Sequence, residues 1–494
     1  MAPYINNACD IDMKYEPTYE SLRKHEVPIW FHDAKFGIFI HWGLFSVPAM
    51  APYHTYAEWY LNNLRFPECD DGQTLKYHTE KYGKDFDYYD FIPMFNEAIK
   101  KWSPNEWVDL FKKVNARYVV LVTKHHDGFL LWPSKYPNPK ANNMIAERDI
   151  VGELTEAVKK RGMIMGLYYS GLWDWKIYHY GSAKNFAHDI YRRTTTDEYA
   201  KYAFNHWYEL IDTYDPLILW NDIGMPIHHK GDLWELFSYF YNKHPDGVID
   251  DRFSQIKKWM RILLKIPPIK WIFNKISKKY IEAEKEAPEE TLKFHSDFAT
   301  PEYRVFDFIP KKKWECTRGI GWSYGYNQFE TEDDYLSVEA LIHSFIDIVS
   351  KNGNLLLNVG PMADGTIPEY QQKVLLGFGE WLDVNGEAIF GSRPWIRPAT
   401  ETIELYSGDY TTIFAGRFTK NNNSLYLTLM GKPIFIDVPT VLVKDLVIAK
   451  DSTIELLADN SILTWRQEGD NLRIELDKKI KETAAITFKI TPIP

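Results

Sequence analysis

Short apolar runs that each end in a polar or ionisable residue recur along the chain, with longer amphipathic stretches between most of them. Apolar runs without alternation are typical of strands buried on both faces of a parallel sheet. Because strands and helices alternate, the pattern predicts an α/β fold with a (β/α)8-like TIM barrel. We expect its eight strands to begin near residues 36, 118, 163, 217, 248, 294, 314 and 354, the unit around 294–314 lacking a clear intervening helix.

Helical periodicity and end signals predict the helices between these strands. Ser103, Pro104 and Glu106 form a capping-box pattern that opens a helix running to about Val114. Further helices are expected between Asp149 and Gly162 and at about 197–214, 232–244, 337–350 and 368–384. Residues 44–102 contain several prolines and are predicted to be loop-rich, and so long a loop inside a compact domain usually carries function.

The pattern changes at a proline-punctuated hinge, residues 391–398. Beyond it, short alternating runs separated by Gly, Asn and Asp indicate an antiparallel β-sandwich. The runs lie at 411–415, 424–429, 471–475 and 484–490. We therefore expect a catalytic barrel over 1–390 and a C-terminal β-sandwich over 391–494.

A basic amphipathic insertion at about 254–292 interrupts the barrel pattern. Residues 256–280 hold eight Lys or Arg and no acidic residue, interleaved with large apolar side chains, and 282–290 then turn acidic. Such a stretch suits a membrane surface or an anionic partner. The favoured alternative is a helical hairpin packed on the barrel rim and split by Pro267-Pro268.

Composition and net charge limit the classes of binding partner and the cellular location that we expect. The 494 residues carry a net charge of −10, which gives no support to a nucleic-acid partner. No apolar run is long enough for a transmembrane segment, and the N-terminus lacks the basic start and apolar core of a signal peptide. The three cysteines form no C-x-x-C pair, so we expect no disulfide framework and a cytoplasmic location.

Ionisable and aromatic residues stand at the ends of the predicted strands. Strand ends of a β/α barrel converge on one face, where its catalytic residues lie. Two carboxyl groups at this face suit glycoside hydrolysis. One would attack the sugar or activate a water molecule, and the other would donate a proton to the leaving oxygen. Trp42, Trp59 and Trp322 could line a sugar pocket. The strand-end set is His41, His125, His126, Tyr168, Asp222, Arg252 and Asp297 or Glu302.

Other interpretations of the same residues stay open at this point. Asp222 could cap a helix or start a turn. His125, His126 and Asp127 could be metal ligands of a barrel hydrolase. Adjacent residues on a strand point to opposite faces, however, and a ligand pair would sooner be His-x-His.

Several motifs, in the right order over almost the whole chain, closely resemble the α-L-fucosidases of glycoside hydrolase family 29. This resemblance implies a barrel with a C-terminal β-sandwich and a retaining exo-hydrolase of terminal α-L-fucose that needs no cofactor. It implies a fucosylated oligosaccharide or glycoconjugate as substrate and is compatible with a homo-oligomer. The alternative outside the enzyme class is a catalytically inactive fucose-binding module. The motifs are Trp30-Phe31, 35–43, 57–60, 123–129, 168–170, 219–222 and 354–361.

The resemblance also implies roles for individual residues. Asp222 matches the nucleophile, and Glu302, in Thr300-Pro301-Glu302-Tyr303, matches the acid/base, with Glu315 as substitute candidate. A retaining pair predicts carboxyl groups about 5–5.5 Å apart. The residues matched to sugar binding are His41, Glu58, Trp59, His125, His126, Tyr168, Trp220, Arg252 and Tyr324.

Overall fold

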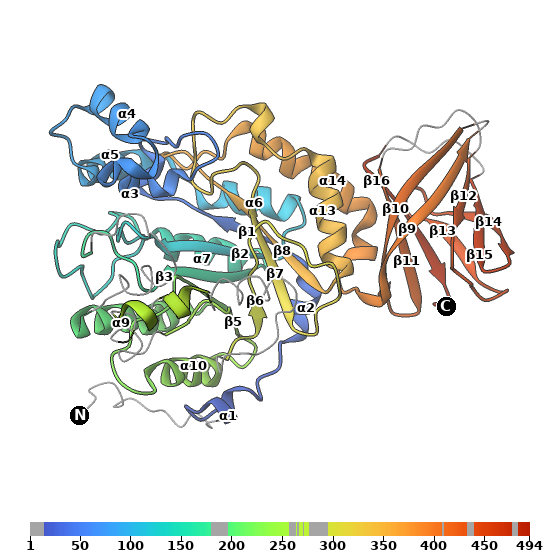
Figure 1. The fold of residues 1–494 in the computed structure, drawn as a ribbon, viewed down its shortest axis with the longest axis horizontal. Helices are drawn as coiled ribbons and strands as arrows, with labels where there is room; N and C mark the ends of the chain where they lie inside the picture. Colours follow the sequence, from blue (N-terminus) through green and yellow to red (C-terminus); the bar gives the residue numbers. More distant parts are fainter. Residues whose placement is uncertain are drawn as a thin grey trace.

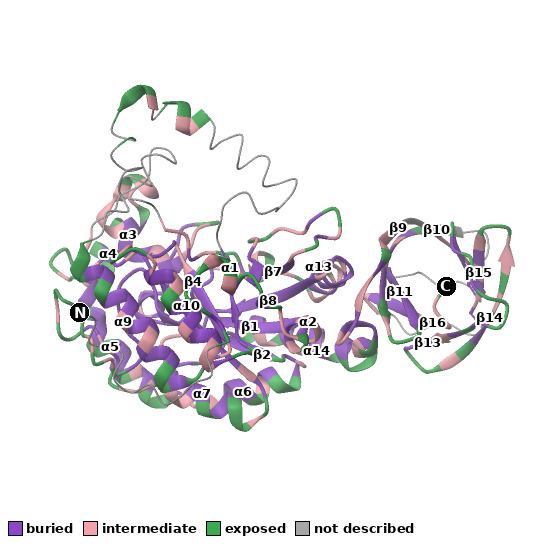
Figure 2. Cartoon of the chain, turned by 90° about the horizontal axis from the view of Figure 1, so that it is seen from below, coloured by how far each residue is buried: buried purple, intermediate pink, exposed green. Residues whose placement is uncertain are grey.

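The computed structural model shows a helix-covered barrel followed by a separate β-domain at the C-terminal end (Figure 1). It describes residues 14–178, 196–255, 263, 266–269, 271–275, 295–407, 410–431, 439–476 and 483–494. Buried residues concentrate inside the barrel and beneath its helices, and exposed residues lie at the periphery (Figure 2).

Eight parallel strands form the barrel in the order β5-β4-β3-β2-β1-β8-β7-β6. Strands β5 and β6 stand at the two ends of this order. The Asp297 backbone N–H donates to the Ile249 carbonyl at 2.8 Å, and the Ile249 N–H donates to the Asp297 carboxylate at 2.7 Å. These two bonds link the ends, so the predicted (β/α)8-like barrel is confirmed. The strands are β1 Phe36–Ile40, β2 Tyr118–Lys124, β3 Ile164–Ser170, β4 Ile218–Asp222, β5 Val248–Ile249, β6 Phe298–Ala299, β7 Lys313–Gly319 and β8 Gly353–Val359.

The predicted position of the sixth strand is wrong. The sequence pattern predicts that this strand begins near residue 294, but β6 comprises Phe298–Ala299, and residue 294 lies outside the described residues. The Asp297 carboxylate accepts hydrogen bonds from Tyr241 and from the Ile249 N–H, and it pairs with His25 at 2.8 Å. Asp297 therefore links neighbouring elements through its side chain and lies outside the cavity instead of continuing a strand into it.

The predicted barrel helices are present and cover the strands. Their apolar sides face the barrel; Ile150, Leu154 and Val158 of α7, for example, are fully buried. The expected capping box of Ser103 is wrong, because the Ser103 side chain makes no capping hydrogen bond at the N-terminus of its helix. The helices are α6 Pro104–Lys113, α7 Ile150–Lys160, α9 Asp197–Tyr214, α10 Asp232–Lys243, α13 Val338–Ser350 and α14 Glu369–Ile389.

Residues 44–102 are more helical than predicted. They contain α3 Tyr60–Arg65, α4 Gln73–Tyr82 and α5 Phe91–Ala98. The periodic signal is weak because two of these helices are shorter than ten residues, and their aromatic side chains pack on one another; Tyr82 and Phe91, for example, meet edge to face at 4.8 Å.

The antiparallel β-domain predicted at the C-terminal end is confirmed, and its eight strands close into a ring. It packs on α13 and α14: Tyr426 donates to the Glu387 carboxylate at 2.7 Å, and the Trp381 indole donates to the Ala485 carbonyl at 3.2 Å. The strands are β9 Arg393–Ser407, β10 Tyr410–Asn421, β11 Ser424–Met430, β12 Thr440–Val443, β13 Thr453–Leu456, β14 Ser461–Glu468, β15 Asn471–Glu475 and β16 Ala485–Thr491.

Two further predictions concern segments described only in part. Most of the insertion at 254–292 lies outside the described residues, so neither its hairpin nor its membrane interpretation is tested.

Cys69 and Cys316 are free thiols, and Cys9 lies outside the described residues. No helix in the described part of the chain has the length and apolar character needed to cross a bilayer.

Candidate active site

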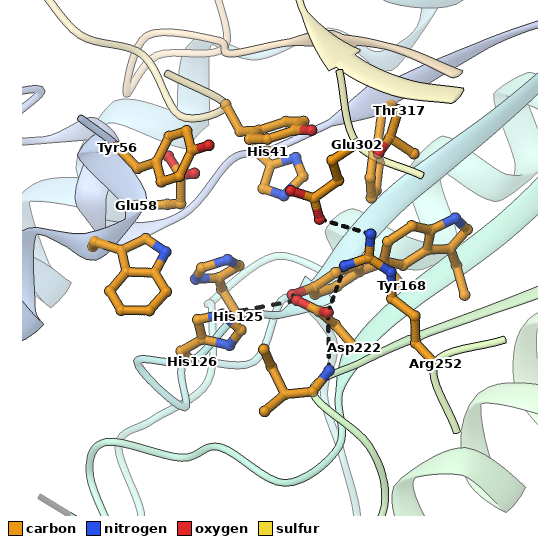
Figure 3. A pocket seen from close by; sticks show the side chains of 15 residues that line it. His41, Tyr56, Glu58, His125, His126, Tyr168, Asp222, Arg252, Glu302 and Thr317 are labelled. Carbon is orange, nitrogen blue, oxygen red and sulfur yellow. Dashed lines mark hydrogen bonds and ion pairs between the residues drawn. The ribbon is translucent and has the colours of Figure 1, made fainter. Parts of the chain in front are cut away.

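A cavity of about 220 Å³ opens at the carboxyl ends of the barrel strands (Figure 3). Drug-sized ligand sites are typically about 300–1,000 Å³, so this cavity suits a single small ring. Every catalytic or sugar-binding residue implied by the family resemblance lines it. The lining residues are Phe39, His41, Tyr56, Glu58, Trp59, His125, His126, Tyr168, Trp220, Asp222, Ile223, Arg252, Glu302, Thr317 and Tyr324.

Asp222 is the last residue of β4, and its carboxylate is held on both oxygens. Oδ2 accepts from the Tyr168 hydroxyl at 2.9 Å, and Oδ1 accepts from Arg252 Nη1 at 3.0 Å and from the Ile223 N–H at 2.9 Å. Burial acts to raise the pKa of Asp222, but the charge of Arg252, with smaller contributions from His126 and Tyr168, holds it below its usual value. The carboxylate is therefore ionised and points into the cavity instead of capping a helix.

Arg252 links the two candidate catalytic carboxyl groups. Its Nη1 binds Asp222, and its Nη2 lies 2.7 Å from Glu302 Oε1, so the guanidinium stands between them (Figure 3). The guanidinium also lies 4.7 Å above the Trp220 ring. Sharing one guanidinium brings both carboxyl groups to the same cavity, while their predicted spacing of about 5–5.5 Å stays a prediction.

The substitute acid/base candidate, Glu315, does not line the cavity. It is fully buried on β7 and accepts hydrogen bonds from the Tyr118 hydroxyl and, at 3.2 Å, from the Trp220 indole. Burial raises the pKa of Glu315 to about 7. Glu315 thus lies beneath Trp220, and the geometry favours Glu302 as the acid/base.

His41 presents a defined ring nitrogen to the cavity. The Asn358 amide N–H donates to the Tyr324 carbonyl at 2.6 Å, so the Asn358 oxygen is the acceptor toward His41 Nδ1, also 2.6 Å away. His41 therefore carries its proton on Nδ1, which leaves Nε2 to accept from a ligand hydroxyl. Burial lowers the pKa of His41 to about 4, so the ring is neutral at pH 7.

His125 and His126 both line the cavity although they are adjacent. Strict alternation no longer applies to them, because β2 ends at Lys124 after a register irregularity beside β3. His126 Nε2 lies 3.8 Å from Asp222 Oδ2, and its Nδ1 bonds to Ser170.

Asp127, the third candidate metal ligand, does not line the cavity with His125 and His126. Its carboxylate accepts from the Tyr88 hydroxyl at 2.8 Å and from the Phe129 N–H at 3.1 Å. Among the described residues, no three His, Cys, Asp or Glu side chains are grouped so as to hold a metal ion.

Glu58 comes from the segment before α3, and its carboxyl group lies at the cavity wall. It accepts from the Gly325 N–H at 2.7 Å and from the Ser323 hydroxyl at 3.3 Å. Burial raises the pKa of Glu58 to about 7 despite these bonds. Its neighbour Trp59 meets the His126 ring edge to face at 5.8 Å, so both residues help to shape the cavity.

The three tryptophans predicted to line a sugar pocket lie in three different places in the structure. Trp59 lines the cavity, but Trp42 is 1% exposed and packs between Trp102 and Trp107, about 5 Å from each, in the core. The prediction for Trp42 is therefore wrong, because successive residues at the end of β1 face opposite sides and His41 takes the inner one. Trp322 lies outside the lining and is exposed.

A family model described as alpha-L-fucosidase matches residues 4–387. This chain belongs to the alpha-L-fucosidase family. It is 33% identical over 402 residues to an alpha-L-fucosidase of Dictyostelium discoideum, which covers 81% of this chain and 78% of that protein. It is 32% identical over 405 residues to the plasma alpha-L-fucosidase of Homo sapiens, covering 79% and 74% of the two chains.

Solved structures agree with the family. The Thermotoga maritima alpha-fucosidase in complex with a mechanism based inhibitor is 38% identical and matches with a TM-score of 0.79, over 97% of this chain and 100% of that one. The same enzyme in complex with fucose matches at 38% identity with a TM-score of 0.78, over the same shares. The resemblance inferred from the motifs is confirmed, and the chain is a glycoside hydrolase.

Four lining residues of this fucosidase site were not predicted: Phe39, Tyr56, Ile223 and Thr317. Phe39 stands two positions before His41 on β1, so the period of a strand could have found it. Ile223 directly follows Asp222 and has a left-handed backbone, with φ of 64°. For Tyr56 and Thr317 the sequence held no comparable signal, because their inclusion depends on how a loop and β7 sit against the barrel.

Thr300 and Asp251 are positioned to orient Arg252. Arg252 Nε donates to the Thr300 hydroxyl at 2.8 Å, and that hydroxyl donates to Asp251 at 2.6 Å. We expect Thr300→Val to lower kcat for an α-L-fucoside by roughly tenfold, because a misplaced guanidinium misorients both carboxyl groups. Steady-state kinetics with Thr300→Ser, which keeps the hydroxyl, is the control; equal losses in both variants would contradict this role.

Proposed function

We propose that this chain removes terminal α-L-fucose from fucosylated oligosaccharides or glycoconjugates with retention of configuration, through a covalent fucosyl-enzyme. One observation carries the proposal: Asp222 and Glu302, bridged by Arg252, face one cavity the size of a sugar ring in a member of the alpha-L-fucosidase family. The related Thermotoga maritima enzyme, which binds fucose and a mechanism based inhibitor, supports it.

In the first step, an Asp222 oxygen attacks the anomeric carbon of fucose. The bond to the glycosidic oxygen breaks with its electron pair on that oxygen, which takes the proton of Glu302. Asp222 is suited to attack because its ionised form is stabilised by Arg252 and Tyr168. Glu302 has a side chain 41% exposed, so it can exchange protons with water.

In the second step, ionised Glu302 takes a proton from water as the water oxygen attacks the anomeric carbon. The ester to Asp222 breaks, and its electron pair returns to the carboxylate. His41 Nε2 and the Glu58 carboxyl group are proposed to bind fucose hydroxyls during both steps. Trp59 and Tyr324 are proposed to contact the apolar faces and the methyl group of the sugar.

The stereochemistry of the first product tests the mechanism. Proton NMR of a freshly started reaction with an aryl α-L-fucoside should show α-L-fucose first, with the β anomer appearing later by mutarotation. Release of β-L-fucose first would mean single displacement, and absence of any turnover would contradict the function itself.

The pH dependence of kcat/KM follows from the buried groups of the site. In Glu58→Gln, which removes the proton uptake of Glu58 near pH 7, and on α-L-fucosyl fluoride, which needs no proton from the acid/base, we expect kcat/KM to stay flat down to about pH 5 and to fall near pH 4. The reason is that His41, with its pKa lowered by burial to about 4, stays neutral above that pH, and that Asp222 has its pKa lowered further. A decrease in kcat/KM centred near pH 6.5 would indicate instead that a histidine with an ordinary pKa controls the activity.

A cytoplasmic location and a homo-oligomeric state are also proposed. The free thiols of Cys69 and Cys316 support a reducing compartment. Fractionation with a compartment marker tests the first proposal, and light scattering of the purified chain tests the second.

A further inference from the structure

Three aromatic rings form a row on the surface beside the cavity and take no part in the site described above. Tyr53 is 75% exposed and Trp322 is 44% exposed. His54 lies between them, its ring centre 3.7 Å from that of Tyr53 and 4.1 Å from that of Trp322. We call Tyr53, His54 and Trp322 the aromatic platform. Contiguous exposed rings of this kind mark binding surfaces more often than isolated ones do.

The platform is joined to the cavity on two sides. His54 lies two residues before Tyr56, and Trp322 lies two residues before Tyr324; both tyrosines line the cavity, and their rings are 5.9 Å apart. The backbone carbonyl of Trp322 accepts a hydrogen bond from the Tyr303 hydroxyl at 3.1 Å. Tyr303 directly follows Glu302, so the platform is tied to the acid/base residue.

The backbone around the platform holds an unfavourable conformation. His54 has φ of 58° and Tyr303 has φ of 51°, a left-handed region that residues other than glycine rarely adopt. Such conformations persist where the surrounding contacts impose them, and they cluster at functional sites. The left-handed backbone at His54 and Tyr303 thus indicates that surrounding contacts hold these two residues in place beside the platform.

The size of the cavity determines where the rest of a substrate must lie. A volume of about 220 Å³ suits one ring, so the sugar that carries the fucose must lie outside it. The acid/base must reach the glycosidic oxygen between the two sugars, which places the second sugar beside Glu302. Glu302 and Tyr303 are also open to solvent, and Tyr303 is bonded to the platform.

We propose that the aromatic platform is the subsite for the leaving-group sugar, binding the C–H face of an uncharged pyranose that carries the fucose. The inference rests on the proposed function and adds to it the residues that select among fucosides. The rings of Tyr53 and Trp322 carry no charge and present flat faces of the size of a pyranose, the geometry in which C–H groups contact an aromatic ring.

The test compares two substrates of the full-length protein. α-L-Fucosyl fluoride has no second sugar, whereas a fucosyl disaccharide places a pyranose in the subsite. We expect Trp322→Ala to lower kcat/KM for the disaccharide by roughly tenfold, the effect of about one stacking contact, and to leave the fluoride unchanged within about twofold. Trp322→Phe should keep most of the disaccharide activity, and Tyr53→Ala should repeat the selective loss.

Phe308→Ala is the matched control. Phe308 is 39% exposed, and its neighbour Phe306 packs on Trp314 near the start of β7, at the end of the barrel opposite to the cavity. This variant should leave kcat/KM unchanged for both substrates. Equal kcat/KM losses for both substrates in Trp322→Ala and Tyr53→Ala, or no loss for the disaccharide, would overturn the subsite alone. Failure of the unmodified protein to hydrolyse the fluoride would overturn the proposed function and, with it, the subsite.

Discussion

Replacing Asp222 by alanine is expected to lower kcat for an aryl α-L-fucoside by at least about 10³-fold, because the variant lacks the carboxylate that attacks the anomeric carbon. Asp222 is the carboxylate held ionised by Arg252 and Tyr168 at the end of β4. Added azide should restore part of the turnover, since the small anion can occupy the space of the missing carboxylate. The product of that rescue should be a fucosyl azide of inverted configuration, detectable by NMR.

The matched control is Asp246→Ala, an exposed aspartate in the loop that precedes β5, at the other end of the barrel. It should keep kcat within about twofold, as surface substitutions generally have small effects. Full activity of Asp222→Ala would remove the nucleophile assignment. A loss without azide rescue, accompanied by a lower melting temperature, would point to a folding defect instead.

Replacing Glu302 by alanine should make turnover depend on the leaving group. General acid catalysis contributes about 10²–10⁴-fold where the leaving oxygen needs a proton. We therefore expect kcat/KM to fall by roughly 10³-fold for a fucosyl disaccharide, but by no more than about tenfold for a dinitrophenyl fucoside, whose leaving group departs as an anion. Steady-state kinetics with both substrates measures the ratio.

Glu315→Ala is the comparison that decides between the two glutamates. Glu315 is fully buried and accepts hydrogen bonds from Tyr118 and Trp220, so its removal leaves two buried donors unpaired beside a new cavity. We expect the free energy of unfolding to fall by about 2–5 kcal/mol, and the ratio between the two substrates to stay as in the unmodified protein. A leaving-group dependence in Glu315→Ala, and none in Glu302→Ala, would reverse the assignment.

The barrel was predictable because burial on both faces leaves a local signature. Apolar runs such as 36–40 and 118–122 are recognisable without any tertiary contact, and β1 and β2 begin where those runs begin. The sixth strand was misplaced because it has only two residues and depends on Asp297 cross-links to His25, Tyr241 and Ile249. These partners lie far away in sequence, and a pattern of nearby residues cannot show them.

The sequence by itself determined which strands carry ionisable residues at their ends, and its motifs identified the family and Asp222. Only the tertiary structure decided at which level of the barrel each side chain lies. Glu315 and Thr317 share one face of β7, but Thr317 reaches the cavity, where its backbone forms a β-bridge with that of Glu302, whereas Glu315 lies one layer below. The reason is that alternation fixes the face of a side chain, while its height depends on the register between strands and on segments far away in sequence.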